Sequence, residues 1–239
     1  MDRDRGQNEP ARPAGSSPPG DSGQAAMWRA LTTDPTTGVS VVCHDGTIAY
    51  VNEQSTRIFQ KPGIGPTHVQ GKKMHEVFPE EFARERMRIF RWVIERQKPV
   101  LFRAIWQGFQ HLSWITPIPG FDGEEDNRQV LIITRRVAGD TQEIVLAHEG
   151  FRRVNANVID LGELSTLSPR ELVVLALLGG GLSLKEIARY LRRSLSTIET
   201  QRESIGRKLK LADRAELIRL VERTGLRLED LSEDPGGPA

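Results

Sequence analysis

Cysteine is nearly missing from this 239-residue sequence, which holds only Cys43, so no disulfide can form within the chain. Long apolar runs are missing too, since no stretch approaches the ~20 apolar residues that a membrane-spanning helix needs. The first ten residues, MDRDRGQNEP, lack the apolar run of a secretory signal. These absences predict a soluble, cytoplasmic protein that does not bind a membrane.

An excess of either charge is also absent, because 33 Lys and Arg oppose 32 Asp and Glu. The formal net charge of +1 excludes a protein that coats nucleic acid over its whole surface. Between Arg192 and Arg214, however, seven basic residues oppose three acidic ones, which leaves an excess of four positive charges. This local excess predicts a basic patch, for which a solvated helix face is the simpler alternative.

Catalytic motifs are absent as well. The sequence contains no phosphate-binding loop, no metal-ligand spacing and no nucleophile motif, so it predicts no enzyme and no metal site. A response regulator switched by phosphorylation would carry an aspartate at the end of a central parallel strand. Asp45 instead precedes Gly46 in a pair typical of a hairpin turn, which disfavours that alternative.

What is present is a succession of helical patterns from Leu167 to Leu211. Ser168 and Glu171 form a capping box around Pro169, which suits the first helical position. Three glycines, 179–181, end this first helix.

A second, shorter helix begins after Ser183, and a third is capped by Ser194 or Ser196. Two short helices joined by a turn of about three residues form a helix-turn-helix pattern. A further helix is expected over 214–223, ended by Gly225.

Four motifs in this region share their order and spacing with one family. LSPRE at 167–171, KEIA at 185–188, STIET at 196–200 and IGRKL at 205–209 resemble the C-terminal DNA-binding domain of LuxR-type transcription regulators. The resemblance covers about residues 164–224. It implies an all-α domain of four helices that binds double-stranded DNA as a homodimer, with RNA polymerase as a further candidate partner. The dimer surface it implies lies on the last helix, at Leu217, Leu220 and Val221.

In the LuxR-type domain the third helix enters the major groove, which is wide enough for one helix. The resemblance and the expected outward arc of the helix place base reading at Glu199, Thr200, Arg202 and Glu203. The expected phosphate contacts, which set register rather than sequence, are Lys185, Ser196, Thr197, Arg207 and Lys208. This chain departs from the usual family pattern at Arg193, Gln201, Glu203 and Gly206.

The segment 26–138 alternates strand and helix signals. Strands are expected over 39–43, 47–51, 100–107, 112–118 and 130–134, with helices over 53–60 and 80–97. A five-stranded antiparallel sheet with helices on one face follows from this order. It resembles a PAS domain, as do the motifs at Asp45-Gly46, Tyr50-Val51-Asn52, Gly71-Lys72 and Trp106-Gln107-Gly108. The resemblance implies a sensor or dimerisation role.

No cofactor is predicted for this PAS-like segment, and its ligand is unknown. Nothing distinguishes His44, His68, His75 or His111 as a haem ligand, and ordinary surface or core positions are the simpler interpretation. Cys43 is expected to be a small core residue. A small organic ligand between sheet and helices stays open.

The expected organisation is a PAS-like α+β domain over 26–138, a helical linker over 139–163 and an all-α helix-turn-helix domain over 164–225. Tails at 1–25 and 226–239 flank them, and the N-terminal one is expected to be disordered. In the linker, Ile144, Phe151 and Val158 stand seven apart, which favours a helix paired between two protomers. Gly150 favours an irregular connector instead.

The sequence as a whole predicts a sequence-specific DNA-binding transcription regulator with a PAS-like sensor. The alternatives are a phosphorylation-dependent response regulator and a PAS-containing scaffold whose helix-turn-helix binds protein.

Overall fold

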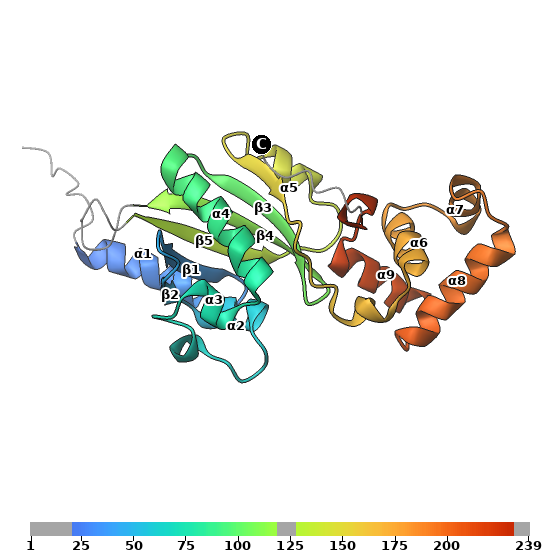
Figure 1. The fold of residues 1–239 in the computed structure, drawn as a ribbon, viewed down its shortest axis with the longest axis horizontal. Helices are drawn as coiled ribbons and strands as arrows, with labels where there is room; N and C mark the ends of the chain where they lie inside the picture. Colours follow the sequence, from blue (N-terminus) through green and yellow to red (C-terminus); the bar gives the residue numbers. More distant parts are fainter. Residues whose placement is uncertain (1–20, 119–127, 232–239) are drawn as a thin grey trace, which may run out of the picture.

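The computed structural model describes residues 21–118 and 128–231 (Figure 1). Most of the tail expected at 1–25 and the end of the tail expected at 226–239 lie outside the described residues. So does the segment 119–127, which joins the strands expected over 112–118 and 130–134. Residues 21–25, which we expected in the N-terminal tail, instead begin helix α1, Asp21–Thr33. Within the described ranges, no helix is long and apolar enough to cross a membrane.

One mixed sheet of six strands forms the N-terminal part of the molecule. The strands are β1 Gly38–Cys43, β2 Ile48–Val51, β3 Val100–Trp106, β4 Phe109–Ile118, β5 Gln129–Arg136 and β6 Arg152–Asn155, in the order β2-β1-β5-β4-β3-β6. The first five pair antiparallel, which confirms the expected PAS-like sheet. The sixth was not expected, and it runs parallel to β3.

Short helices and one long helix cover one face of this sheet (Figure 1). They are α2 Glu53–Phe59, a 3-10 turn Pro66–His68, α3 Met74–Val77 and α4 Glu80–Arg96. The apolar stripe of α4, with Phe82, Ile89 and Val93, packs with Phe102 and Ile115 of the sheet in one buried cluster. Asn52 fixes the entry to α2, because its side chain accepts from Ser55 N and Val39 N.

The connector between sheet and C-terminal helices is not the helix that the seven-residue spacing suggested. It consists of a short helix α5, Gln142–Leu146, then β6, and then a 3-10 turn Gly162–Thr166. Ala156 N donates to Arg103 O at 2.8 Å and Asp160 N donates to Ile105 O at 3.0 Å, so the connector follows the edge of β3. The sheet edge satisfies its backbone groups, and the predicted helical linker over 139–163 is wrong.

Four helices form the C-terminal domain, as expected: α6 Pro169–Gly179, α7 Leu184–Tyr190, α8 Leu195–Lys208 and α9 Arg214–Thr224. The predicted capping box of Ser168 with Glu171 is present, and Ser183, the expected cap of α7, forms a second one with Glu186. The four helices pack around buried Leu175, Ile187, Ile198 and Ile205. This arrangement leaves one side of α7 and α8 facing solvent.

The segment after α9 is not a free tail, although we expected one from residue 226. Leu226 is buried, and a 3-10 turn, Leu228–Leu231, packs against α6. The expected tail therefore begins no earlier than residue 232.

Candidate nucleic-acid interface

The turn between α7 and α8 fixes the angle at which the two helices meet. Arg192 adopts a left-handed backbone conformation, with φ of 53°, and Arg193 N donates to Ala188 O at 2.9 Å. Ile187 and Ala188 of α7 lie in the same buried cluster as Ile198 of α8. The two helices therefore form the helix-turn-helix unit that the sequence predicts.

The start of α8 carries a cluster of hydroxyl groups. Ser194, rather than Ser196, is the N-cap, since its Oγ accepts from Thr197 N at 3.1 Å. The same Oγ lies 2.9 Å from Ser196 Oγ and 2.7 Å from Thr197 Oγ1. Both Ser196 and Thr197 are exposed. Hydroxyls and backbone N–H groups thus share a helix N-terminus, which favours anions.

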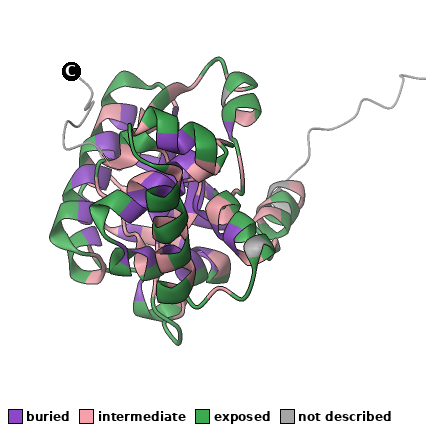
Figure 2. Cartoon of the chain, turned by 90° about the vertical axis from the view of Figure 1, so that its right-hand side faces the viewer, coloured by how far each residue is buried: buried purple, intermediate pink, exposed green. Residues whose placement is uncertain are grey.

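The outward face of α8 is formed by Glu199, Thr200 and Glu203, all of them exposed. Figure 2 shows the solvent-facing surfaces of the C-terminal helices in green around their buried interior. Thr200 Oγ1 donates to Ser196 O at 2.9 Å, which ties the hydroxyl to its own helix. Arg207 stands seven residues after Thr200, on the same face.

Arg202 does not share this face, contrary to our expectation. It stands four residues after Ile198 and three before Ile205, both fully buried, so helical spacing turns it toward the interior. It is half-buried and lines a surface groove with Leu217 and Ile218 of α9. The predicted outward orientation was therefore wrong for this residue, and its part in base reading stays an untested prediction.

Lys208 is occupied within the domain. Its Nζ lies 2.6 Å from Glu171 Oε2, and the Glu171 side chain is only 7% exposed. Burial alone would raise the pKa of Glu171, but hydrogen bonds from Lys208, Ser168 and Ser204 lower it to about 2. This pair joins the end of α8 to the start of α6. Lys185 and Arg207 are exposed, as Lys208 is, but they form no ion pair with any residue in 21–118 or 128–231.

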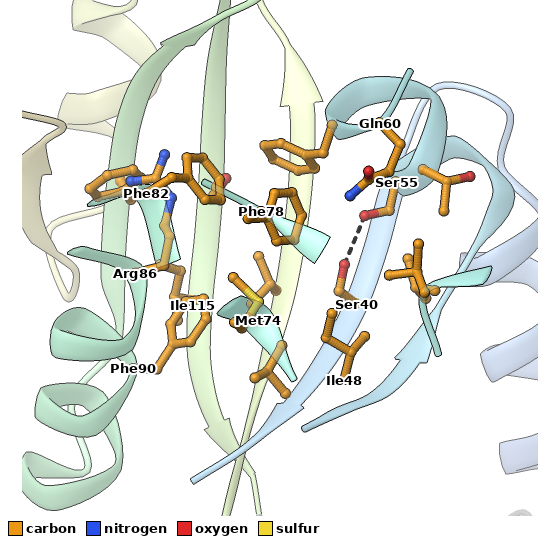
Figure 3. Close-up of a pocket in the computed structure, with 18 residues that line it drawn as sticks. Ser40, Ile48, Ser55, Gln60, Met74, Phe78, Phe82, Arg86, Phe90 and Ile115 are labelled. Atoms are coloured by element: carbon orange, nitrogen blue, oxygen red, sulfur yellow. Dashed lines mark hydrogen bonds between the residues drawn. The ribbon is translucent and has the colours of Figure 1, made fainter. Parts of the chain in front are cut away.

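A separate cavity of about 60 Å³ lies between the sheet and helices α2–α4 (Figure 3). Its wall is mainly apolar, with Met74, Phe78, Phe90 and Ile115 among the lining residues. The polar groups on the wall come from Ser40, Ser55, Thr56, Gln60, Arg86 and Ser113. A volume of this size holds at least one water molecule or part of a small ligand.

Arg86 supplies a buried positive charge at this wall. Its guanidinium lies over the rings of Phe82 and Phe102, at 4.4 and 3.9 Å from their centroids, and Nη1 donates to Glu85 Oε2 at 2.9 Å. Burial lowers its pKa to about 10, so it stays protonated at neutral pH. Nearby, the pKa of the buried His111 falls to about 3 because of burial and the charges of Arg136 and Arg86. This histidine is therefore neutral.

Buried polar atoms of Gln60 and His111 lack hydrogen-bond partners among the described residues. They are Nε2 of Gln60, which lines the cavity, and the two ring nitrogens of His111, which is 1% exposed. No group of three or more His, Cys, Asp or Glu in the described part of the chain could hold a metal. The cavity therefore offers hydrogen-bonding groups rather than metal ligands.

The comparisons with known proteins decide the nature of the C-terminal helices. Residues 165–221 match the family model described as bacterial regulatory proteins, luxR family. This segment is a LuxR-type domain. No curated protein matches the chain.

Several solved structures are similar to the chain at low identity. A VqmA–ligand–DNA complex from Vibrio cholerae is 18% identical over 85% of this chain and 90% of that chain, with a TM-score of 0.47. A domain of an HTR-like protein from Haloarcula marismortui is 18% identical over 43% and 98%, with a TM-score of 0.36. The PAS domain of the histidine kinase ThkA is 18% identical over 42% and 98%, with a TM-score of 0.35.

The dimer surface expected on α9 of the LuxR-type domain is only partly available. Leu217 and Leu220 are buried in the core of the domain, because both face α6, and Val221 is half-buried. Ile218 is 46% exposed instead. Leu217 and Leu220 therefore do not form an open dimer surface here, and any contact through α9 has to use Ile218 and the half-exposed Val221.

Sequence reasoning missed several of these positions. Glu171 was recognised as a cap but not as the partner of Lys208, which stands 37 residues away. Arg86 lies in an arginine-rich helix, so its role at the cavity was not predicted. The one sequence signal for it is its position on the apolar stripe, four residues from both Phe82 and Phe90. Cys43, expected in the core, is half-buried at the end of β1, where its Sγ accepts from Gln129 Nε2 at 3.6 Å.

Proposed function

We propose that this protein is a sequence-specific transcription regulator that reads DNA with α8 of its LuxR-type domain. The observation that carries the proposal is the exposed face of α8, on a segment that matches the luxR family model. Glu199, Thr200 and Glu203 reach base edges in the major groove. A glutamate accepts from cytosine N4, and the threonine methyl group contacts the thymine methyl group.

Phosphate contacts surround this reading face. Ser196, Thr197 and the first N–H groups of α8 bind one phosphate at the helix start. Lys185 and Arg207 bind others, because both are exposed and have no acidic partner among the described residues. Lys208 is removed from this set, since it is held by Glu171. Two glutamates on the reading face oppose the phosphates, so non-specific binding is weak and sequence-specific contacts matter more.

Two copies bind together in this proposal. A two-fold homodimer reads an inverted repeat whose half-sites lie about one turn of DNA apart. The protein acts in the cytoplasm, where bacterial DNA lies, and RNA polymerase is the partner through which it changes transcription. It carries out no catalysis of its own.

The PAS-like domain is the sensor in this proposal, and its cavity receives a compact, largely apolar molecule. Arg86 and Gln60 donate hydrogen bonds to an acceptor group of this molecule, while the phenylalanine rings enclose its apolar part. Native mass spectrometry of protein purified from cells tests this sensor role. A retained small molecule that disappears in the cavity-filling variant Ser113→Leu is the expected result.

Selection from a random pool of double-stranded DNA tests the reading function. The wild-type protein is expected to enrich one motif with two-fold symmetry, and folded Thr200→Ala protein to enrich a motif changed at the positions that Thr200 contacts. Arg88→Ala, an exposed change on α4, is the control and leaves the motif unchanged. If Thr200→Ala selects the wild-type motif, α8 does not read bases as proposed. If no sequence is enriched at all, the protein-binding scaffold becomes the better interpretation.

A further inference from the structure

Part of the outer face of the sheet, opposite the helices and the cavity, contacts the C-terminal part of the chain at one end of β3 and β4. Ile105 of β3 is fully buried and belongs to the same apolar cluster as Leu164, Leu175 and Leu226 of the C-terminal part. Figure 1 shows α9 beside the end of the sheet. The two domains therefore share a packed contact, rather than being joined only by the connector.

A buried ionic cluster lies within this contact. Arg103 of β3 lies 2.7 Å from Asp230 Oδ1 through Nη1, and its Nη2 lies 3.0 Å from Asp230 Oδ2. The two side chains are 5% and 3% exposed. Arg103 also donates to Gly225 O and, through Nε, to Gln110 Oε1 at 2.7 Å. The guanidinium fork is thus satisfied on both sides of the domain contact, as a buried charge requires.

The neighbouring contacts are polar too. Gln110 Nε2 donates to Gly139 O at 3.0 Å, and Gly139 N donates to Glu222 O of α9 at 2.8 Å. Arg227 donates to Thr141 Oγ1 at 3.2 Å. Such bonds are satisfied in one relative orientation only, because they depend on distance and angle. They also separate more easily than a large apolar interface, since charges regain hydration in water.

We propose that Arg103 and Asp230 form an interdomain latch that sets the orientation of the LuxR-type domain relative to the PAS-like sheet. The latch does not block DNA, because Glu199, Thr200 and Glu203 stay exposed while it is closed. Its effect is to hold the reading helix of each protomer at one angle to its own sensor domain.

The sheet gives the latch a direct link to the cavity. Successive residues of a strand face opposite sides, so Phe102 lines the cavity while Arg103 belongs to the latch. Ser113 and Gln110 stand in the same relation on β4. A shift of these two strands caused by a molecule in the cavity therefore moves Arg103 and Gln110 relative to Asp230.

Double electron–electron resonance, which measures the distance between two spin labels, tests the latch without DNA. One label is placed on each domain. The labels are placed at Lys98→Cys and Arg189→Cys, both exposed, in a Cys43→Ser background. An excess of unlabelled protein ensures that each dimer carries one labelled chain. A single narrow distance is expected with the native pair, and a broad distribution with Asp230→Asn or Arg103→Gln.

The matched control is Arg88→Gln, which removes the same charge from an exposed position on α4 and is expected to keep the narrow distance. Circular dichroism confirms folding, and Asp230→Asn serves if Arg103→Gln does not fold. Equally narrow distances in folded latch variants would overturn the proposal.

A second measurement rests on the proposed DNA-binding function. Duplexes with two selected half-sites at varied spacing are expected to bind the wild-type dimer with affinities that differ by about 10-fold or more. Asp230→Asn is expected to flatten this dependence to a few-fold, because freed domains reach several spacings. An unchanged spacing dependence counts against the latch, whereas failure of both proteins to bind DNA counts against the proposed function and leaves the spin-label result to stand.

Discussion

Side chains on α8 divide into exposed ones, which we propose face DNA, and others that hold the domain together, and neighbouring residues differ in this respect. Arg207 and Lys208 show this most clearly. Both are exposed, but Arg207 has no acidic partner in the described residues, while Lys208 is paired with Glu171. Both carry one positive charge and they are adjacent in the sequence, so their roles differ because α6 packs against α8 on the side of Lys208.

Replacing each of these two residues by alanine is expected to give different results. Arg207→Ala reduces the slope of log affinity against log salt by about 1, because one phosphate contact is lost. Lys208→Ala keeps the slope and lowers the melting temperature, because it leaves Glu171 buried without its lysine. Binding titrations at several salt concentrations and thermal unfolding measure the two effects. An equal loss of slope in both variants would mean that Lys208 reaches DNA after all.

Glu171 makes the LuxR-type domain sensitive to acid. Its folded-state pKa of about 2 lies below the ordinary value of 4.5, so its contribution to stability is complete above pH 4.5 and is lost as the pH falls toward 2. Glu171→Gln is expected to lose about 1–3 kcal/mol at pH 7 and to unfold with a weaker dependence on pH in this window. Thermal unfolding between pH 2 and 7 measures both.

The matched control for Glu171 is Glu186→Gln, the same change in the capping box of α7. Hydrogen bonds from Ser183 lower the pKa of Glu186 as well, but this side chain is exposed and no lysine pairs with it among the described residues. Glu186→Gln is therefore expected to lower the free energy of unfolding by less than Glu171→Gln does. If the two variants lose equal stability, the pair with Lys208 contributes little.

At the scale of single residues, the sequence predicted positions better than orientations. Glu199, Thr200 and Glu203 face outward as expected. Arg202 does not, although its spacing from Ile198 and Ile205 was already visible in the sequence. Buried ion pairs such as Arg103 with Asp230 could not be predicted, because their members stand 127 residues apart.

Helices and antiparallel strands were predictable because their signals are local. Ser168 and Ser183 cap the helices that the sequence assigns to them, and the Asp45-Gly46 turn joins the first two strands. Strand β6 was missed, since it is four residues long and pairs in parallel with a strand about 50 residues earlier. The apolar spacing of the connector around it, at Ile144, Phe151 and Val158, favoured a helix, and the open edge of β3 determines the strand instead.

Gly225 ends α9 and also lies at the contact between the two domains. Gly225 has a φ of 54°, and a Cβ placed there would overlap the amide of Gln110 across the contact. Gly181 has a φ of 83° with nothing within 4 Å of such a Cβ. Both Gly→Ala changes are expected to lower the free energy of unfolding by ~1–2 kcal/mol, because alanine is strained in the left-handed conformation.

Gly225→Ala is expected to lose a further ~1–3 kcal/mol from the overlap with Gln110. Chemical denaturation of the two variants gives the difference directly. Equal losses at 225 and 181 would show that the contact at Gln110 adapts without strain.

If the contact between the sheet and the LuxR-type domain stabilises both domains, the whole molecule unfolds in a single transition. The four tryptophans, at 28, 92, 106 and 114, all lie outside the LuxR-type domain, so their fluorescence reports only the PAS-like part. Circular dichroism reports the helices of both domains. Coincident transitions from the two probes are therefore expected for the wild-type protein, because the shared contact couples the domains.

Ile105→Ala is expected to separate these transitions. It removes an apolar side chain that fills the LuxR-type cluster, at a loss of ~2–5 kcal/mol, and leaves the cavity side of β3 intact. The helical signal then falls at a lower temperature than the tryptophan signal. Ile89→Ala is the matched control, since Ile89 is equally buried in the other cluster and its loss lowers both transitions together. Coincident transitions in Ile105→Ala would mean that the covalent connector and the polar latch couple the domains without this apolar contact.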